Sequence, residues 1–217
     1  MSAKLSSRRV LLVHGLWMRS FSMRWLATRL SSQGFDTSLF GYYSLLQDTD
    51  AVVARLARRL SEQPGTHVVA HSLGGLLTLR AAEQVGAIHL GRIVCLGSPL
   101  AGSQAAASIV ARIPAGATVV GHNRALLASG INHIPPGLQV GAIAGCVPRG
   151  LGGVVAHFTC EHDGTVATHE TRVPGLVDHA VVRASHSGLM FSDAAVRQAT
   201  LFLREGRFEH GAGAGAV

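Results

Sequence analysis

The chain has 217 residues, 47% of them hydrophobic and 14% charged, which suits one α/β domain and is small for two. This composition excludes a disordered protein, and because the 26 glycines follow no three-residue period, a collagen-like protein is excluded as well. The formal net charge of +7 comes largely from arginines that are spread along the chain without interleaved aromatic residues, so nucleic acid is not expected as a partner.

Strand and helix signals alternate along the first part of the chain. They predict, in chain order, a strand at 10–13, a helix that Ser22 caps and Gly34 ends, a strand at 37–40, a helix opened by Asp48 or Asp50 and stopped at 64–65, a strand at 67–70, a helix from 72 to about 85, and a strand at 92–96. Such alternation is typical of crossover units, so we expect an α/β fold with a mostly parallel central sheet and helices on both faces.

The second part of the chain is less regular. Residues 99–136 are rich in Gly, Ala and Ser and are interrupted by proline, which predicts one or two short helices lying over the sheet. Strands are predicted at 138–144 and 180–184, and Ser192 is expected to cap a final helix that ends at Gly206. Residues 1–210 are therefore expected to form a single domain with a minimal lid or none, followed by a disordered Gly/Ala tail at 211–217.

Ser72 lies where a predicted strand runs directly into a predicted helix. A serine at such a junction occupies a very tight turn, and its backbone is held in a disfavoured conformation. Small residues two positions away on each side let the strand and the helix pass closely, and Ala70 and Gly74 meet this need. A serine that only caps a helix would not need them. The turn would present the Ser72 hydroxyl at the carboxyl edge of the sheet, where open α/β folds bind ligands.

The stretch at 67–75 resembles the nucleophile elbow of the α/β-hydrolase superfamily, and in particular that of small bacterial lipases and esterases. Ala70 stands at a position that is usually glycine, and alanine there also occurs in some of those lipases. The resemblance covers nearly the whole chain. It implies the α/β-hydrolase fold, with Ser72 as the nucleophile of a Ser-His-Asp triad.

A serine hydroxyl is a weak nucleophile and needs a general base. In the superfamily, the acid and then the histidine follow the serine along the chain. His186 is the expected base, because it lies between the last predicted strand and the last helix. His179 begins that strand and is therefore expected at the opposite edge of the sheet, and His210 is in the tail.

Asp163 is the expected acid of the triad. It lies in a loop before the last predicted strand, and the Gly-Thr-Val that follows it matches the acid loop of lipases in this superfamily. Glu161 lacks the turn-forming glycine after it, and Asp178 falls where strand pairing should begin. An ionised Asp163 would hold the imidazole of the base in one tautomer.

Two backbone N–H groups are expected to form an oxyanion hole. One is that of Leu73, directly after the nucleophile, and the other is that of Leu16, because the preceding His-Gly pair resembles the oxyanion loop of bacterial lipases. Trp17 and Met18 either wall the acyl pocket or pack in the core. Residues 96–103 either line the same pocket or form a turn.

No metal and no organic cofactor are expected. His157, Cys160 and His162 lie close in the chain, but no other set of ligands has a matching spacing. The glycines at 150, 152 and 153 fail both the dinucleotide and the P-loop spacings. The three cysteines cannot all pair, and no secretory signal follows the start of the chain, so a reduced, cytoplasmic location is expected.

These features predict a serine hydrolase that cleaves small-molecule carboxylic esters with short or medium acyl chains, lipid-like esters, or exposed polyesters. An acyltransferase or thioesterase would use the same triad, and the sequence does not separate these activities. A non-catalytic binding protein would normally have lost a triad member. Integral membrane association is not expected, because no apolar run approaches the roughly 18 residues of a membrane span.

Overall fold

The computed structural model describes residues 7–112, 120–149 and 160–210, and it is built around a six-stranded sheet. The strands are β1 (Arg9–Val13), β2 (Asp36–Phe40), β3 (His67–His71), β4 (Ile93–Leu96), β5 (Val140–Gly145) and β6 (Asp178–Val182). They lie in the order β2-β1-β3-β4-β5-β6, and every neighbouring pair is parallel. The carboxyl end of β3, which leads into Ser72, is therefore flanked by the carboxyl ends of β1 and β4.

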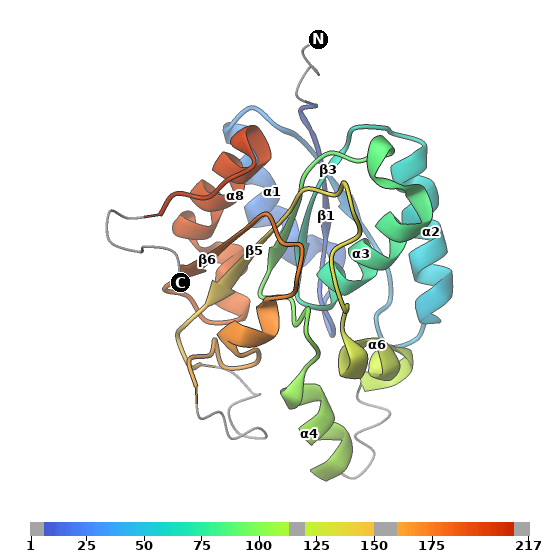
Figure 1. Cartoon of the computed structure of the whole chain (residues 1–217), viewed down its shortest axis with the longest axis vertical. Coiled ribbons are helices and arrows are strands. Elements are labelled where there is room, and N and C mark those ends of the chain that lie inside the picture. The colour runs from blue at the N-terminus through green and yellow to red at the C-terminus, as the bar shows by residue number, and fades with distance from the viewer. Residues whose placement is uncertain (1–6, 113–119, 150–159, 211–217) are drawn as a thin grey trace.

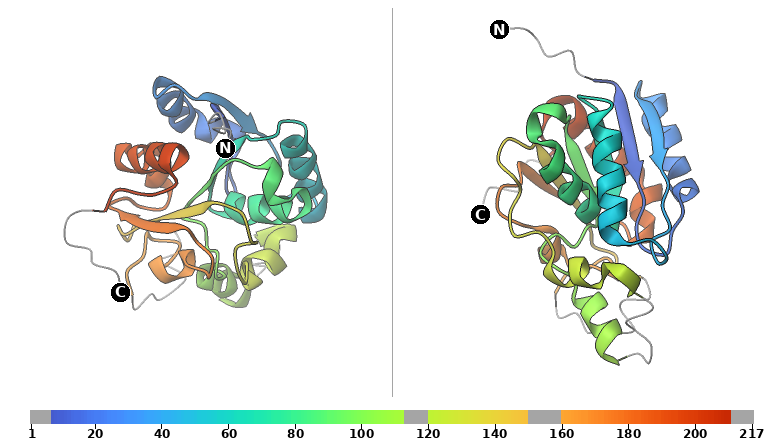
Figure 2. Two further views of the ribbon diagram at one scale, coloured as in Figure 1. Left: turned by 45° about the horizontal axis from the view of Figure 1, so that its top comes forward. Right: turned by 90° about the vertical axis from the view of Figure 1, so that its right-hand side faces the viewer.

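Helices cover both faces of the sheet, as predicted (Figures 1 and 2). On one face lie α1 (Arg24–Ser32) and α8 (Asp193–Glu205), and on the other lie α2 (Thr49–Ser61) and α3 (Leu73–Val85). The short helices α4 (Gln104–Arg112) and α6 (Arg124–Ser129) project beyond the carboxyl ends of the strands, at the bottom of Figure 1. Single turns of 3-10 helix occur at Ser20–Met23, Ala87–His89, Gly121–Asn123, Thr168–Thr171 and Ser187–Phe191. Within the described ranges, no helix is both long enough and apolar enough to cross a membrane.

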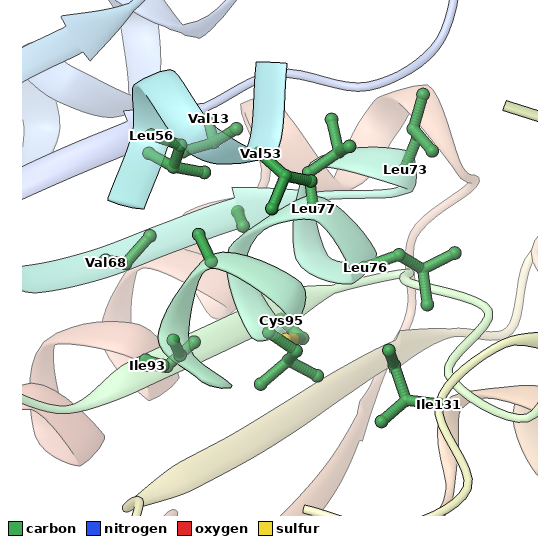
Figure 3. Close-up of a cluster of buried hydrophobic side chains, with 14 of the residues drawn as sticks. Val13, Val53, Leu56, Val68, Leu73, Leu76, Leu77, Ile93, Cys95 and Ile131 are labelled. Carbon is green, nitrogen blue, oxygen red and sulfur yellow. The ribbon is translucent and has the colours of Figure 1, made fainter. Parts of the chain in front are cut away.

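The side chains of the central strands alternate between two hydrophobic cores. In β1, Leu11 and Val13 face α2 and α3, whereas Val10 and Leu12 face α1 and α8. This period of two follows from the pleat of a strand, and β3 and β4 show it as well. Figure 3 shows the first of these cores, in which strand residues such as Val68 pack against helix residues. Because both faces are buried, the strands read in the sequence as continuous apolar runs.

Most of the predicted helix ends are confirmed. The carboxylate of Asp48 caps α2 by accepting from the Ala51 N–H at 3.0 Å, which decides between the two candidate aspartates. Ser192 caps α8 through the Ala195 N–H at 3.2 Å, and Gly206 ends α8 in the left-handed conformation. The prediction that Ser22 caps α1 is wrong. Its hydroxyl donates instead to the Arg19 carbonyl at 2.8 Å, inside a 3-10 turn that precedes the helix.

Two predicted strand positions need correction by about two residues. β6 begins at Asp178 rather than at 180, because Asp178 pairs in register with Gly141 of β5. β5 begins at Val140 rather than at 138, because the Leu138 N–H is bonded to the Pro135 carbonyl within a turn. The short helices predicted within 99–136 are present as α4 and α6, although 113–119 lie outside the described residues. The predicted tail at 211–217 lies outside them too.

Candidate active site

Ser72 sits in the strained turn that the sequence predicts. Its φ is 54° and its ψ is −124°, and α3 begins at the next residue. Trp17 is the only other residue besides glycine in the described ranges with a positive φ. A non-glycine residue in this region carries a local cost of order 1–3 kcal/mol. The surrounding contacts must therefore hold Ser72 in place.

The small residues flanking Ser72 allow two chain segments to touch. A Cβ atom built on Gly74 would lie 2.6 Å from the carbonyl oxygens of both Val13 and His14. A side-chain Cβ essentially never comes closer than 3.0 Å to such an atom. Ala70 is fully buried at the end of β3. The first turn of α3 therefore packs directly on the backbone of β1, which places Ser72 beside the loop that follows β1.

Replacement of Gly74 with alanine is expected to destabilise the fold by about 1–3 kcal/mol, the usual range for overpacking a tight site. The opposing carbonyls belong to Val13, the last residue of β1, and to His14 directly after it, and they cannot move without disturbing the end of the strand. The matched control is Gly41→Ala, whose added Cβ would lie 3.6 Å from the nearest atom, the Ser20 Oγ. Urea unfolding of both variants provides the measurement, and equal midpoints would contradict the packing argument.

Three side chains predicted from the sequence meet at the carboxyl edge of the sheet. The Nε2 atom of His186 lies 3.0 Å from the Oγ atom of Ser72, and its Nδ1 atom lies 2.8 Å from the Oδ2 atom of Asp163. The Asp163 side chain is 1% exposed and that of His186 is 10% exposed. The imidazole thus bridges a hydroxyl and a buried carboxylate, an arrangement that can move a proton off the hydroxyl.

Asp163 is fixed by its own turn. The Oδ1 atom accepts hydrogen bonds from the N–H groups of Thr165 at 2.9 Å and Val166 at 2.8 Å, which leaves Oδ2 for His186. The Asp163 backbone carbonyl also accepts from the His186 N–H at 2.9 Å. Each part of Asp163 therefore has a defined partner, and the carboxylate cannot rotate away from the imidazole without losing hydrogen bonds.

Two glycines at strand ends make room for this pair, and sequence reasoning missed both. Gly97, after β4, has a φ of +56°, and a Cβ there would lie 3.2 Å from both the Oδ2 atom of Asp163 and the Nδ1 atom of His186. A Cβ on Gly145, at the end of β5, would lie 2.9 Å from the Asp163 Cβ. A glycine directly after a buried apolar run was the available signal.

The loop after β1 passes beside the nucleophile. A Cβ on Gly15 would lie 2.9 Å from the Ser72 Cβ, so the loop that carries Leu16 passes directly beside the nucleophile. The Trp17 N–H is bonded to the Ser44 Oγ at 3.0 Å, which ties this loop to the one after β2. Leu73 is the first residue of α3, where backbone N–H groups have no partner within the helix. The amides of Leu16 and Leu73 therefore both lie near Ser72.

His14 and Tyr42 form a buried support for this loop. Their rings stack with centroids 4.1 Å apart, and the Tyr42 hydroxyl donates to the His14 carbonyl at 2.8 Å. The Nδ1 atom of His14 lies 2.9 Å from the Gly15 carbonyl, which requires a proton on that nitrogen. Burial lowers the pKa of His14 and raises that of Tyr42, so both rings stay neutral.

The other histidines and acids considered for the base and the acid of the triad contact groups away from Ser72. The Nε2 atom of His179 contacts the Thr171 Oγ1 at 2.7 Å, and burial lowers the pKa of His179 to about 4. His210 bonds to Asp178 at 2.8 Å, and Glu161 bonds to the Thr168 hydroxyl at 3.2 Å. None of these contacts reaches Ser72, so the structure brings His186 and Asp163 to the serine and not their rivals.

The cysteine and histidine cluster considered in the sequence does not form a metal site in the part that the structure describes. Cys160 lies 3.6 Å from the Nδ1 atom of His169, and His157 lies outside the described residues. The glycines at 150, 152 and 153 lie outside them as well. Among the described residues, no group of three or more His, Cys, Asp or Glu side chains is arranged to hold a metal ion.

The parallel sheet, the strained Ser72 turn and the adjacent histidine define an α/β hydrolase. Residues 10–199 match the model of the alpha/beta hydrolase family, so the chain belongs to this family. The predicted fold and family are thereby confirmed.

Solved structures have the same fold at low sequence identity. The mature form of the Bacillus licheniformis lipase BlEst2 superposes with a TM-score of 0.75 at 19% identity, covering 94% of each chain. A Listeria innocua protein matches with a TM-score of 0.61 at 16% identity, covering 94% of this chain and 96% of its own. Aspergillus fumigatus lipase B matches with a TM-score of 0.62 at 13% identity, covering 94% of this chain and 54% of the lipase. A comparison with curated proteins found no match.

Proposed function

We propose that this protein is a serine hydrolase that cleaves carboxylic esters through an acyl-enzyme. The observation that carries the proposal is the continuous set of contacts from the Ser72 hydroxyl through His186 to the buried Asp163, at 3.0 Å and 2.8 Å. Its position at the carboxyl edge of a parallel sheet is where ligands bind in folds of this kind.

In the first half of the reaction, His186 Nε2 takes the proton of Ser72 as the Oγ atom attacks the ester carbonyl. The imidazolium that forms keeps its proton on Nδ1 and donates it in a hydrogen bond to the Asp163 carboxylate, whose negative charge stabilises the positive ring. Collapse of the tetrahedral intermediate breaks the bond to the alcohol oxygen, and His186 Nε2 gives its proton to the leaving alkoxide. The products are the free alcohol and acylated Ser72.

In the second half, a water molecule takes the place of the alcohol. His186 removes one of its protons as its oxygen attacks the acyl carbonyl, and then returns that proton to the Ser72 oxygen as the carboxylic acid leaves. The amides of Leu16 and Leu73 would hold the oxyanion in both halves, and the N-terminus of α3 adds its dipole. Each such donor is typically worth about 3 kcal/mol in the transition state. This chemistry uses neither a metal nor an organic cofactor.

Apolar side chains exposed on the loop that passes Ser72, and on the loop bonded to it, support an ester with an apolar acyl group. Trp17 in the loop after β1 is 48% exposed, and Leu46 in the loop after β2 is 80% exposed. The bond between the Trp17 N–H and Ser44 holds these two loops together, and Tyr43 and Leu45 are exposed beside them. Apolar side chains exposed next to a polar site favour substrates that are apolar at one end. Short or medium acyl esters and lipid-like esters have this property.

The proposal is tested by measuring hydrolysis of p-nitrophenyl esters of graded acyl length, with a fluorophosphonate probe and peptide mass spectrometry in parallel. We expect turnover together with one label per chain on the peptide that contains Ser72. Matched acyl thioesters and an added alcohol acceptor separate the esterase from a thioesterase or an acyltransferase. If the protein shows neither labelling nor turnover, the proposal is overturned and a binding protein is favoured.

A further inference from the structure

His71 is buried beside the candidate active site, and the mechanism above does not use it. It is the last residue of β3, directly before Ser72, and its side chain is enclosed. Its Nε2 atom lies 2.9 Å from the backbone carbonyl oxygen of His186. A carbonyl only accepts hydrogen bonds, so the Nε2 atom must carry a proton and donate it.

The ring of His71 is neutral. Burial, together with smaller effects of the nearby rings of His186 and His14, lowers its pKa to about 3, although the hydrogen bond to the His186 carbonyl and the Asp163 carboxylate act in the opposite direction. With the proton on Nε2, the Nδ1 atom of a neutral ring is bare, and no described residue hydrogen-bonds to it. One donor on a rigid ring therefore points at His186 across the ordinary pH range.

This hydrogen bond completes the restraint on His186. The His186 N–H donates to the Asp163 carbonyl at 2.9 Å, its ring lies between Asp163 and Ser72, and its own carbonyl accepts from His71. The two imidazole rings lie 4.7 Å apart between centroids. Because His71 adjoins Ser72 in the chain, its ring connects the turn that carries the nucleophile to the loop that carries the base.

We propose that His71 is a positioning residue, which sets the distance between Ser72 Oγ and His186 Nε2 by holding the His186 backbone. This inference rests on the proposed function, because it assigns His71 a part in the same reaction. Distances between reacting groups matter steeply: a displacement of about 1 Å can cost on the order of 10²-fold in rate.

The test compares His71→Gln with His71→Asn. The glutamine amide reaches about as far as the Nε2 atom of histidine and can donate to the His186 carbonyl, whereas the asparagine amide is one methylene shorter and cannot. His67→Asn is the matched control, because His67 is buried at the other end of the same strand and its Nδ1 atom accepts from the Arg92 N–H at 2.7 Å.

We expect His71→Asn to lower kcat about 10- to 100-fold per titrated active site with little change in KM, and His71→Gln to restore most of it. His67→Asn should keep the kcat of the unaltered protein. An unchanged kcat in His71→Asn, or an equal loss in His67→Asn, would overturn the positioning role. If the His71→Asn variant does not fold, the His71→Gln variant provides the test. A loss of kcat above 10-fold in His71→Gln, at an unchanged Tm, would then overturn the positioning role.

A second measurement does not depend on activity. Nitrogen-15 NMR of the unaltered protein should show His71 neutral, with its proton on Nε2, between pH 5 and 8. A protonated ring or the opposite tautomer would overturn the inference. Absence of ester turnover and fluorophosphonate labelling in the unaltered protein is a different result, because it would refute the proposed function itself.

Discussion

Replacement of Ser72 by alanine is expected to lower kcat for ester hydrolysis by about 10⁶-fold, the scale seen when a serine hydrolase loses its nucleophile. Without the hydroxyl no acyl-enzyme forms, and the imidazole of His186 has nothing to activate except water. The oxyanion donors would remain, so a residual rate above the uncatalysed reaction is expected. Initial rates with p-nitrophenyl esters at saturating substrate provide the measurement.

The control for this variant is Ser61→Ala. Ser61 lies at the end of α2, and its hydroxyl donates to the Ala57 carbonyl of the same helix at 3.0 Å, so its removal should leave kcat unchanged. Circular dichroism must show that the Ser72→Ala variant is folded, which is expected because the Ser72 side chain makes no capping hydrogen bond to α3. Equal turnover in the Ser72→Ala and unaltered proteins would show that another residue is the nucleophile.

Replacement of Asp163 by asparagine is expected to lower kcat by about 10⁴-fold. The N–H groups of Thr165 and Val166 require an oxygen at the Oδ1 position, so the new amide nitrogen must occupy the Oδ2 position that faces His186. A donor at that position forces the proton of His186 onto Nε2. The ring would then point a proton at the Ser72 hydroxyl and could not remove one.

Asp178→Asn is the matched control for this prediction. Asp178 also joins a histidine, His210, at 2.8 Å and accepts from the Phe208 N–H at 2.6 Å, but it begins β6 at the other edge of the sheet. Both variants should lose some stability in urea unfolding, while only Asp163→Asn should lose activity. A similar kcat in the two variants would argue against a role for the Asp163 charge in orienting His186.

The sequence was sufficient to predict most of the fold because the central strands β1, β3, β4 and β5 have both faces buried and read as apolar runs, and because α2 and α8 each have one apolar face. The strand–helix junction at Ser72 was equally clear, since a strained turn needs small residues at fixed positions. Asp163 and His186 were found by their place between elements, so their choice depended on predicting the last strand and helix in the right region. An error of two residues at the start of β6 did not affect that choice.

Other parts of the site could not be predicted, because they depend on contacts between segments distant in the chain. The contact of Gly97 with Asp163 and His186 arises only when β4 and the two loops that carry these residues meet. The contact of His71 with the His186 carbonyl joins residues 115 positions apart, and no pattern near either residue in the sequence predicts it. Ser22 failed as a cap because its hydroxyl has a competing partner three residues back.

The spacing of the site along the chain also bears on how the protein folds. The contact between His186 and Ser72 spans 114 residues, and it requires β5 and β6 to have joined the sheet after β3. Closing loops of this length costs entropy before the contacts they allow can repay it, so pairings of this kind form slowly. During synthesis, the nucleophile leaves the ribosome long before the base does. Under the proposed mechanism, the growing chain therefore lacks a complete triad until β6 and the loop that carries His186 are in place.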